Sequence, residues 1–284
     1  MNFSRLIRVS RPRFWLYLLG SYLIGYVGAS DTLALQNSAI FVSHLFLFSL
    51  PVNLFLYGVN DIYDSETDKL NPKKSDKEIR LNISDRSYLF TLLPGLFGVL
   101  MIATFAQPNN LSRLLMGMFV FLAFFYSAPP LRFKAIPGLD FVSNVLYVVP
   151  GFLAFAQLAG ELPPLWVVVS ASLFAWGLHL FSAIPDIRVD RYAGINTSAV
   201  VLGYHKSLGL VAFLWGAMAL LVIVNSGMMA WSMLALVYPM FALYLLIDSQ
   251  ARIVPIYWTL PYVNGFLGFC LYWYIVIAGD KWLW

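Results

Sequence analysis

NDIYDSETD, residues 60–68, is the stretch that decides the fold of this chain, because a long apolar run over residues 41–59 leads directly into it. Such a run suits a membrane-spanning helix, which needs about 20 mostly apolar residues. Acidic side chains at the end of a membrane helix are costly unless they meet water, a metal ion or a charged partner. If the helix continues, Asn60, Asp64 and Asp68 lie on one face at i, i+4 and i+8, with Asp61 beside them. The stretch therefore predicts a functional site at a helix end.

Composition places the rest of the chain in a lipid bilayer. Of its 284 residues, 60% are hydrophobic and 11% are charged. The mean hydropathy is +0.75, which is too apolar for an ordinary soluble domain. The apolar runs are long and unbroken, whereas a transmembrane barrel would show short alternating strands. The sequence therefore predicts an all-α, polytopic, integral protein of the cell (inner) membrane.

Apolar runs separated by helix breakers predict about nine membrane-spanning helices. The expected ranges are residues 13–30, 39–60, 87–106, 112–128, 140–159, 165–184, 206–225, 229–248 and 257–278. The first range follows an arginine-rich start, but it is full length and lacks a small-residue cleavage site. We therefore interpret it as the first span rather than as a cleaved signal.

The distribution of charge predicts the topology. If the chain is traced from an inside N-terminus, every Lys and Arg except Arg113 and Lys281 falls on the inner side. The positive-inside rule then predicts a cytoplasmic N-terminus. The net charge of +4 is explained by topology, so no nucleic-acid partner is predicted. Cys270 is the single cysteine, which excludes a disulfide within the chain.

Polar residues are concentrated in three inner loops, residues 60–86, 129–139 and 185–205, so the predicted chemistry faces the cytoplasm. The first loop contains Lys73 in a basic pair that suits either a topology anchor or a phosphate contact. The second follows Tyr126 and carries Arg132 and Lys134 after a double proline.

A second acidic motif opens the third loop, where Asp186 and Asp190 repeat the i, i+4 spacing of the first motif. The two motifs lie at the same inner ends of the second and sixth predicted spans. This placement suggests a single transmembrane domain, residues 1–284, made of two pseudo-equivalent halves, residues 1–138 and 139–284.

Facing carboxylates repel one another unless a divalent cation holds them. Carboxylate, amide and water oxygens are the ligands that Mg²⁺ prefers, and Mg²⁺ also takes phosphate oxygens from substrates. The neighbouring Lys and Arg residues would neutralise the remaining phosphate charge. A diphosphate bound here, with its tail among the apolar helices, predicts an isoprenyl diphosphate as the substrate.

Three motifs in this order resemble the UbiA superfamily of intramembrane prenyltransferases. They are Asn60-x-x-x-Asp64-x-x-x-Asp68, the Tyr126-Ser-x-Pro-Pro-x-Arg-x-Lys loop, and Asp186-x-x-x-Asp190-x-x-x-Gly194. The resemblance covers essentially the whole chain and implies a helical bundle around a central cavity that opens laterally to lipid.

The resemblance also implies roles for individual residues. The implied Mg²⁺ ligands are Asn60, Asp64, Asp68, Asp186 and Asp190. The implied diphosphate contacts are Asn60, Asp61, Lys73, Arg132, Lys134 and Arg191. The residues expected to matter most for catalysis are Asp64, Asp68, Tyr126, Lys134, Asp186 and Asp190.

The sequence around each acidic motif is most similar to lycopene elongases, which attach C5 units to carotenoid ends. This similarity implies dimethylallyl diphosphate as donor and a lipid-soluble carotenoid such as lycopene as acceptor. Two alternatives remain open: an aromatic or quinone-precursor acceptor, and, in another class, an ion-coupled transporter or lipid-binding membrane protein.

Several intramembrane polar residues fit either a functional or a packing role. Asp140 and Asn144 share a helix face and could reach the substrate or pack between helices. His44, His179 and His205 have no acidic or histidine partner at ligand spacing, so we interpret them as packed or interfacial residues.

Overall fold

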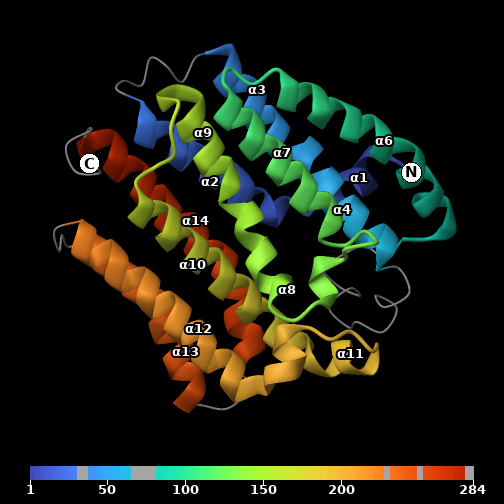
Figure 1. The fold of residues 1–284 in the computed structure, drawn as a ribbon. Helices are drawn as coiled ribbons and strands as arrows, with labels where there is room; N and C mark the ends of the chain where they lie inside the picture. The colour runs from blue at the N-terminus through green and yellow to red at the C-terminus, as the bar shows by residue number, and fades with distance from the viewer. Residues whose placement is uncertain (31–37, 65–80, 227–230, 248–251, 279–284) are drawn as a thin grey trace. The chain divides into compact units, whose positions relative to one another are not determined.

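The computed structural model describes residues 1–30, 38–64, 81–226, 231–247 and 252–278. Within these ranges all regular secondary structure is helical (Figure 1), which confirms the all-α class. The chain divides into two compact units. Unit 1 comprises residues 1–133 and 149–161, and unit 2 comprises residues 134–148 and 162–284.

In the described residues of unit 1, seven α-helices come from two separate stretches of the chain. They are α1 (Phe3–Val9), α2 (Trp15–Ala29), α3 (Ala39–Phe48), α4 (Leu50–Tyr63), α6 (Ile83–Phe105), α7 (Asn110–Phe125) and α9 (Val149–Ala159). Helix α4 packs against α1, α3, α6 and α7, so the first acidic motif ends a helix that is held on several sides.

Helices α2 and α9 of unit 1 approach one another closely. A Cβ atom added to Gly25 would lie 2.0 Å from the carbonyl oxygen of Gly151. The N–H of Gly151 donates to the Oγ of Ser21 at 3.0 Å. Small residues at such crossings are typical of helix packing in membranes, where close backbone contact replaces the hydrophobic effect.

Unit 2 is organised around a buried tryptophan. Its helices are α8 (Leu139–Val142), α10 (Leu165–Ala183), α11 (Ile187–Tyr192), α12 (Ser198–Asn225), α13 (Val237–Ile247) and α14 (Ile253–Ala278). The side chain of Trp215 on α12 is fully buried among Phe181, Tyr238 and other apolar residues. A Cβ on Gly177 of α10 would lie 2.5 Å from the Nε1 atom of Trp215, so a larger residue here would force the buried indole ring to shift.

Membrane-spanning helices are confirmed, whereas nine crossings and the cytoplasmic N-terminus remain predictions. Among the described residues, five helices are long and apolar enough to cross a membrane, or six if a bent pair counts as one span. Two shorter apolar helices cover residues 110–125 and 232–247.

Two predicted spans contain a break in the helical backbone. The range 39–60 breaks at Ser49, whose ψ is −101°. Pro51 follows in the first turn of α4 and has no N–H to donate. The Nδ2 atom of Asn53 donates to the carbonyls of Phe48 and Ser49 at 2.8 and 2.6 Å, which satisfies the acceptors left at the break. The range 140–159 is likewise two helices bent by 43°.

The third inner loop is shorter than the sequence predicts, since α12 begins at Ser198 rather than at residue 206. Thr197 caps this helix by accepting a hydrogen bond from the N–H of Val200 at 3.3 Å. The backbone of Gly203 is not helical (φ 73°, ψ 177°), so two helical stretches meet there at a kink. The predicted span 206–225 corresponds to the stretch beyond this glycine.

Candidate active site

The first acidic motif lies at the C-terminal end of α4 in unit 1. The Nδ2 atom of Asn60 donates to the Oδ2 atom of Asp64 at 2.7 Å, as their i, i+4 spacing predicts. Asp64 ends the helix, with its N–H donating to the carbonyl of Asn60 at 2.9 Å. Both side chains therefore lie on one face of the helix end. Asp68, the third residue of the motif, lies outside the described residues.

Arg11 provides the positive charge beside Asp61. Its Nη2 atom donates to the Oδ1 atom of Asp61 at 2.7 Å and lies 3.4 Å from the Oδ1 atom of Asn60. The guanidinium also lies over the ring of Tyr57, 4.6 Å from its centroid. The side chain of Asp61 is only 3% exposed, so this pair brings an ionised acid into the interior with its counter-charge.

The pair Arg11-Pro12 resembles the start of UbiA-family sequences, but the sequence predicted no site role for Arg11. It lies among several arginines before the first span, and such clusters are normally topology signals. Its backbone is nevertheless unusual, because its φ of 50° lies in the left-handed region that non-glycine residues avoid. Such conformations persist where the surrounding structure holds them, often at functional sites.

The loop after α7 contributes two more residues to the same cluster. The Oγ atom of Ser127 accepts from the Nδ2 atom of Asn60 at 3.0 Å. The Nη2 atom of Arg132 lies 3.6 Å from the Oδ1 atom of Asp64, and its Nε atom is buried without a hydrogen-bond partner. Arg132 also has a positive φ, 41°. Tyr126 caps the C-terminus of α7 and precedes this loop.

In unit 2, Asp140 holds the loop that follows Lys134. Its Oδ1 and Oδ2 atoms accept from the Oγ and N–H of Ser198 at 2.5 and 2.7 Å. The N–H of Gly138 donates to the same Oγ at 2.7 Å. The Nδ2 atom of Asn144 donates to the carbonyl of Asp140 at 2.6 Å. These hydrogen bonds favour a packing role for Asp140 and Asn144. Lys134, which precedes them in the sequence, is also buried.

The second acidic motif lies on a short and more exposed segment of unit 2. Asp186 ends a 3₁₀ turn, Ile184–Asp186, and Asp190 lies in α11, which contains no buried residue. Asp186 occupies the N-cap position of α11, yet its side chain makes no capping bond. The carbonyl of Asp190 accepts from the N–H of Ile195 at 2.9 Å, across a turn in which Gly194 has a φ of 71°.

Two further predicted residues complete the inventory. Arg191 is exposed, and its Nη2 atom lies 3.4 Å from the carbonyl of Val200. Lys73 lies outside the described residues. The structure thus brings Asn60, Asp61, Asp64 and Arg132 together in unit 1 and places Asp186 and Asp190 on neighbouring turns in unit 2.

The donor atoms fit a magnesium–diphosphate ligand. In the described parts of the chain, no three His, Cys, Asp or Glu side chains gather into a metal-binding group. Asn60 and Asp64 nevertheless offer hard oxygen ligands of the kind Mg²⁺ takes together with phosphate oxygens and water. The unpartnered Nε–H of Arg132 suits an anion.

The fold and this cluster define a helical membrane protein with acidic and arginine side chains held together at a helix end. Residues 14–257 match the UbiA prenyltransferase family, and the chain belongs to it. The chain is therefore a prenyltransferase, as the resemblance of its three sequence motifs to this family predicts.

Two relatives also support the predicted lycopene elongase subgroup. A lycopene elongase/hydratase of Haloferax volcanii is 39% identical over 264 residues, covering 92% of this chain and 84% of the relative. A lycopene elongase/hydratase of Halobacterium salinarum is 40% identical over 269 residues and covers 94% of each chain.

A solved structure supports the fold. A UbiA homologue from Archaeoglobus fulgidus, bound to DMAPP and Mg²⁺, superposes with a TM-score of 0.72 at 22% identity. The similarity covers 94% of this chain and 99% of that one. The chain therefore shares the helical architecture of this family.

Proposed function

We propose that this protein transfers a dimethylallyl group from its diphosphate to the end of lycopene or a related carotenoid, with Mg²⁺ as cofactor. The observation that carries the proposal is the cluster at the end of α4, where Asn60, Asp61 and Asp64 are held by two arginines. The names of the two archaeal relatives support the carotenoid acceptor.

The residues of the cluster divide the work of holding a diphosphate. Asn60 and Asp64 present oxygen atoms to the metal, while Arg11 and Arg132 bring positive charge to the phosphate oxygens. Bound Mg²⁺ would stabilise the negative charge that develops on the leaving diphosphate. We also assign metal binding to Asp68, Asp186 and Asp190, diphosphate contacts to Asp61, Lys73, Lys134 and Arg191, and an orienting role to Tyr126.

The proposed reaction begins when the allylic C–O bond breaks and its electron pair leaves with the diphosphate. The terminal alkene of the carotenoid then attacks the allylic cation, forming a C–C bond and a tertiary cation on the acceptor. Loss of a proton gives an alkene, while addition of water followed by proton loss gives an alcohol. The word hydratase in the names of both relatives favours the second ending. An apolar site that excludes bulk water protects the cation until transfer is complete.

Two alternatives are weighed against this proposal. An aromatic or quinone-precursor acceptor would use the same diphosphate site, because the acidic motifs bind the donor and do not specify the acceptor. The alternative hypothesis of an ion-coupled transporter is no longer supported, since the chain is a prenyltransferase. The acceptor is thus the question that an assay must answer.

Purified protein in detergent provides that assay. It is incubated with Mg²⁺ and labelled dimethylallyl diphosphate, and with either lycopene or 4-hydroxybenzoate. We expect label in a C45 carotenoid and, on further transfer, in a C50 carotenoid. Label in the phenol alone would overturn the carotenoid proposal, and omission of divalent cations tests the metal.

We further propose nine membrane crossings, two related halves in one domain, and a cytoplasmic N-terminus. The support is the asymmetry of Lys and Arg residues along the sequence. Reporter fusions test this topology: a fusion after Lys134 should report the cytoplasm, and one after Glu161 the opposite side. Two fusions reporting the same side would contradict the proposed topology.

A further inference from the structure

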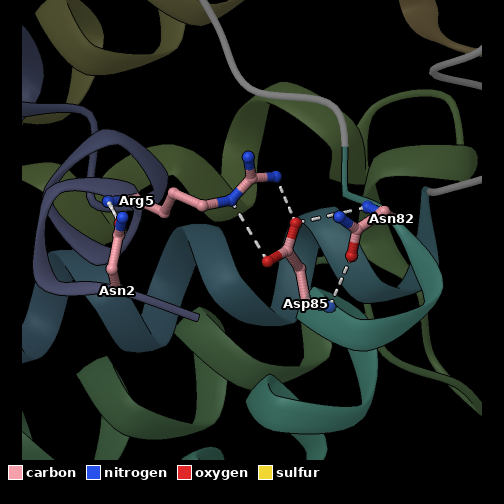
Figure 2. Close-up of polar contacts among 4 residues, drawn as sticks. All are labelled: Asn2, Arg5, Asn82 and Asp85. Carbon is pink, nitrogen blue, oxygen red and sulfur yellow. Dashed lines mark hydrogen bonds and ion pairs between the residues drawn. The ribbon is translucent and has the colours of Figure 1, made fainter.

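Helix α1 is tied to the beginning of α6 by an ion pair between residues far apart in the sequence. Figure 2 shows Arg5 of α1 reaching Asp85 in the first turn of α6. The Nε atom of Arg5 donates to Oδ1 of Asp85 at 3.1 Å, and its Nη2 atom donates to Oδ2. Asp85 is only 3% exposed. A two-point pair with a buried carboxylate fixes direction as well as distance.

Both partners are themselves held in place (Figure 2). The N–H of Asp85 donates to the Oδ1 atom of Asn82 at 2.7 Å, and the N–H of Asn82 lies 3.4 Å from Oδ2 of Asp85. This capping box fixes the carboxylate at the N-terminus of α6. The N–H of Arg5 donates to the Oδ1 atom of Asn2 at 3.0 Å, which caps α1. The ion pair therefore joins two ordered helix starts.

The end of α1 leads directly to the arginine of the candidate site. Ser10 caps the helix, and its Oγ atom donates to the carbonyl of Ile7 at 2.7 Å. The Nε1 atom of Trp15 donates to the carbonyl of Ser10 at 3.0 Å from the following helix. Arg11 lies between these anchored segments with φ 50° and ψ 71°. A non-glycine residue keeps this left-handed conformation only where its flanks are fixed.

We propose that the Arg5–Asp85 ion pair is a positioning element for binding of the diphosphate donor. By holding α1 against α6, it fixes the turn at Arg11 and thereby keeps the Arg11 guanidinium on Asp61 and Asn60. In the described part of the chain, neither Arg5 nor Asp85 makes a hydrogen bond or ion pair with Asn60, Asp61 or Asp64, so both act through α1 and the turn that follows it. The inference rests on the proposed function and adds residues that the three sequence motifs do not contain.

The test compares Asp85→Asn and Arg5→Ala with Arg8→Ala. Asparagine at position 85 keeps an oxygen for the capping box but loses the charge, whereas Arg8 is an exposed arginine of the same helix. We expect the first two variants to raise KM for dimethylallyl diphosphate about tenfold while kcat changes by less than about twofold. Arg8→Ala should match the wild type, and Arg5→Lys should recover part of the loss.

A double variant tests whether the two residues act as one unit. Because each single change breaks the same pair, Arg5→Ala combined with Asp85→Asn should raise KM no further than either change alone. Additive losses would overturn the inference. So would an effect on kcat alone, since positioning of a binding residue acts on donor affinity.

Hydrogen exchange supplies a readout that needs no activity. In detergent-solubilised protein, Asp85→Asn should speed exchange of the amides of residues 5–14, whereas Arg8→Ala should not. Unchanged exchange would overturn the anchoring role, and faster exchange with unchanged KM would overturn the positioning role. A wild-type chain that transfers no dimethylallyl group would defeat the proposed function and the diphosphate role, while the exchange data would still decide whether the pair anchors α1.

Discussion

The two acidic motifs share a spacing but differ in how the protein holds them. In unit 1, Asp61 and Asp64 are 2% and 8% exposed, and each lies beside an arginine. In unit 2, Asp186 and Asp190 are half-buried, and α11, which contains Asp190, has no buried residue. Burying a carboxylate costs several kcal/mol unless a counter-charge is held beside it. Removing one partner of a buried ion pair carries a penalty of similar size. In the first motif, Arg11 and Arg132 supply these counter-charges within the folded chain and so offset the cost of burial.

The supporting helices differ in the same direction. Helix α4 has 14 residues and packs against four other helices, whereas α11 has six residues. A helix shorter than about 12 residues is marginal without tertiary contacts. We infer that the first motif is preorganised and that the second is the more dependent on a bound ligand for its final geometry.

The largest effect should come from removing an acid of either motif. We expect Asp64→Ala and Asp186→Ala each to lower kcat/KM by at least about 100-fold, because each removes a proposed metal ligand at the leaving group. We also expect added Mg²⁺ to restore part of the activity of Asp186→Ala and little of that of Asp64→Ala. A Mg²⁺ titration of prenyl transfer measures this, and full activity of either variant at limiting Mg²⁺ would contradict the proposed metal site.

Removing Arg11 should test the preorganisation of the first motif. Arg11→Gln removes the ion pair between Arg11 and the buried carboxylate of Asp61, so we expect a loss of stability of about 3 kcal/mol and a rise in KM for the donor. The double variant with Asp61→Asn should recover the stability but not the KM. Chemical unfolding and donor titration separate the two effects. Equal stability of Arg11→Gln and the wild type would show that the pair is not structurally important.

In unit 2 the corresponding test is Asp140, whose carboxylate holds Ser198. Asp140→Asn should lower the free energy of unfolding by about 1–3 kcal/mol. The two carboxylate oxygens of Asp140 accept from the hydroxyl and the N–H of Ser198, whereas an asparagine amide has one oxygen that accepts and an NH₂ group that can only donate. We expect a smaller effect on donor KM than for Arg11→Gln. Unchanged unfolding in Asp140→Asn would indicate that these hydrogen bonds contribute little; Ser198→Ala provides the matched variant from the other partner.

The smallest effect should come from Ser127, which only orients Asn60. Ser127→Ala removes one hydrogen bond of about 1 kcal/mol, so we expect a loss of about fivefold in kcat/KM and a loss of stability of no more than about 1 kcal/mol. Initial rates at saturating Mg²⁺ measure it. A loss as large as that of Asp64→Ala would mean that Ser127 contacts the substrate directly.

What the sequence predicts well is local in the chain. The pairing of Asn60 with Asp64 follows from the helical repeat, and the all-α class follows from apolar runs. The partners that the sequence does not reveal are distant. Arg11 meets Asp61 50 residues away, and Asp140 meets Ser198 58 residues away. No periodic pattern links such positions, because they depend on how helices pack.

The sequence also does not reveal every position at which the helical backbone is interrupted. The predicted span 206–225 matches the helical stretch beyond Gly203, but the sequence did not predict the additional helical turns that begin at Ser198, before the non-helical backbone of Gly203. The roles of Asp68 and Lys73 stay predictions from the sequence, since both lie outside the described residues.

The close crossing of α2 and α9 has a consequence for how the protein is made. The face of α2 at Gly25 that α9 covers is synthesised long before Gly151 leaves the ribosome. Unit 1 therefore cannot complete its packing during insertion of its own consecutive helices, and must wait until residues 134–148, which belong to unit 2, have been translated. Biogenesis of the two units is thus interleaved, so a chain truncated before α9 would enter the membrane with this crossing unfilled.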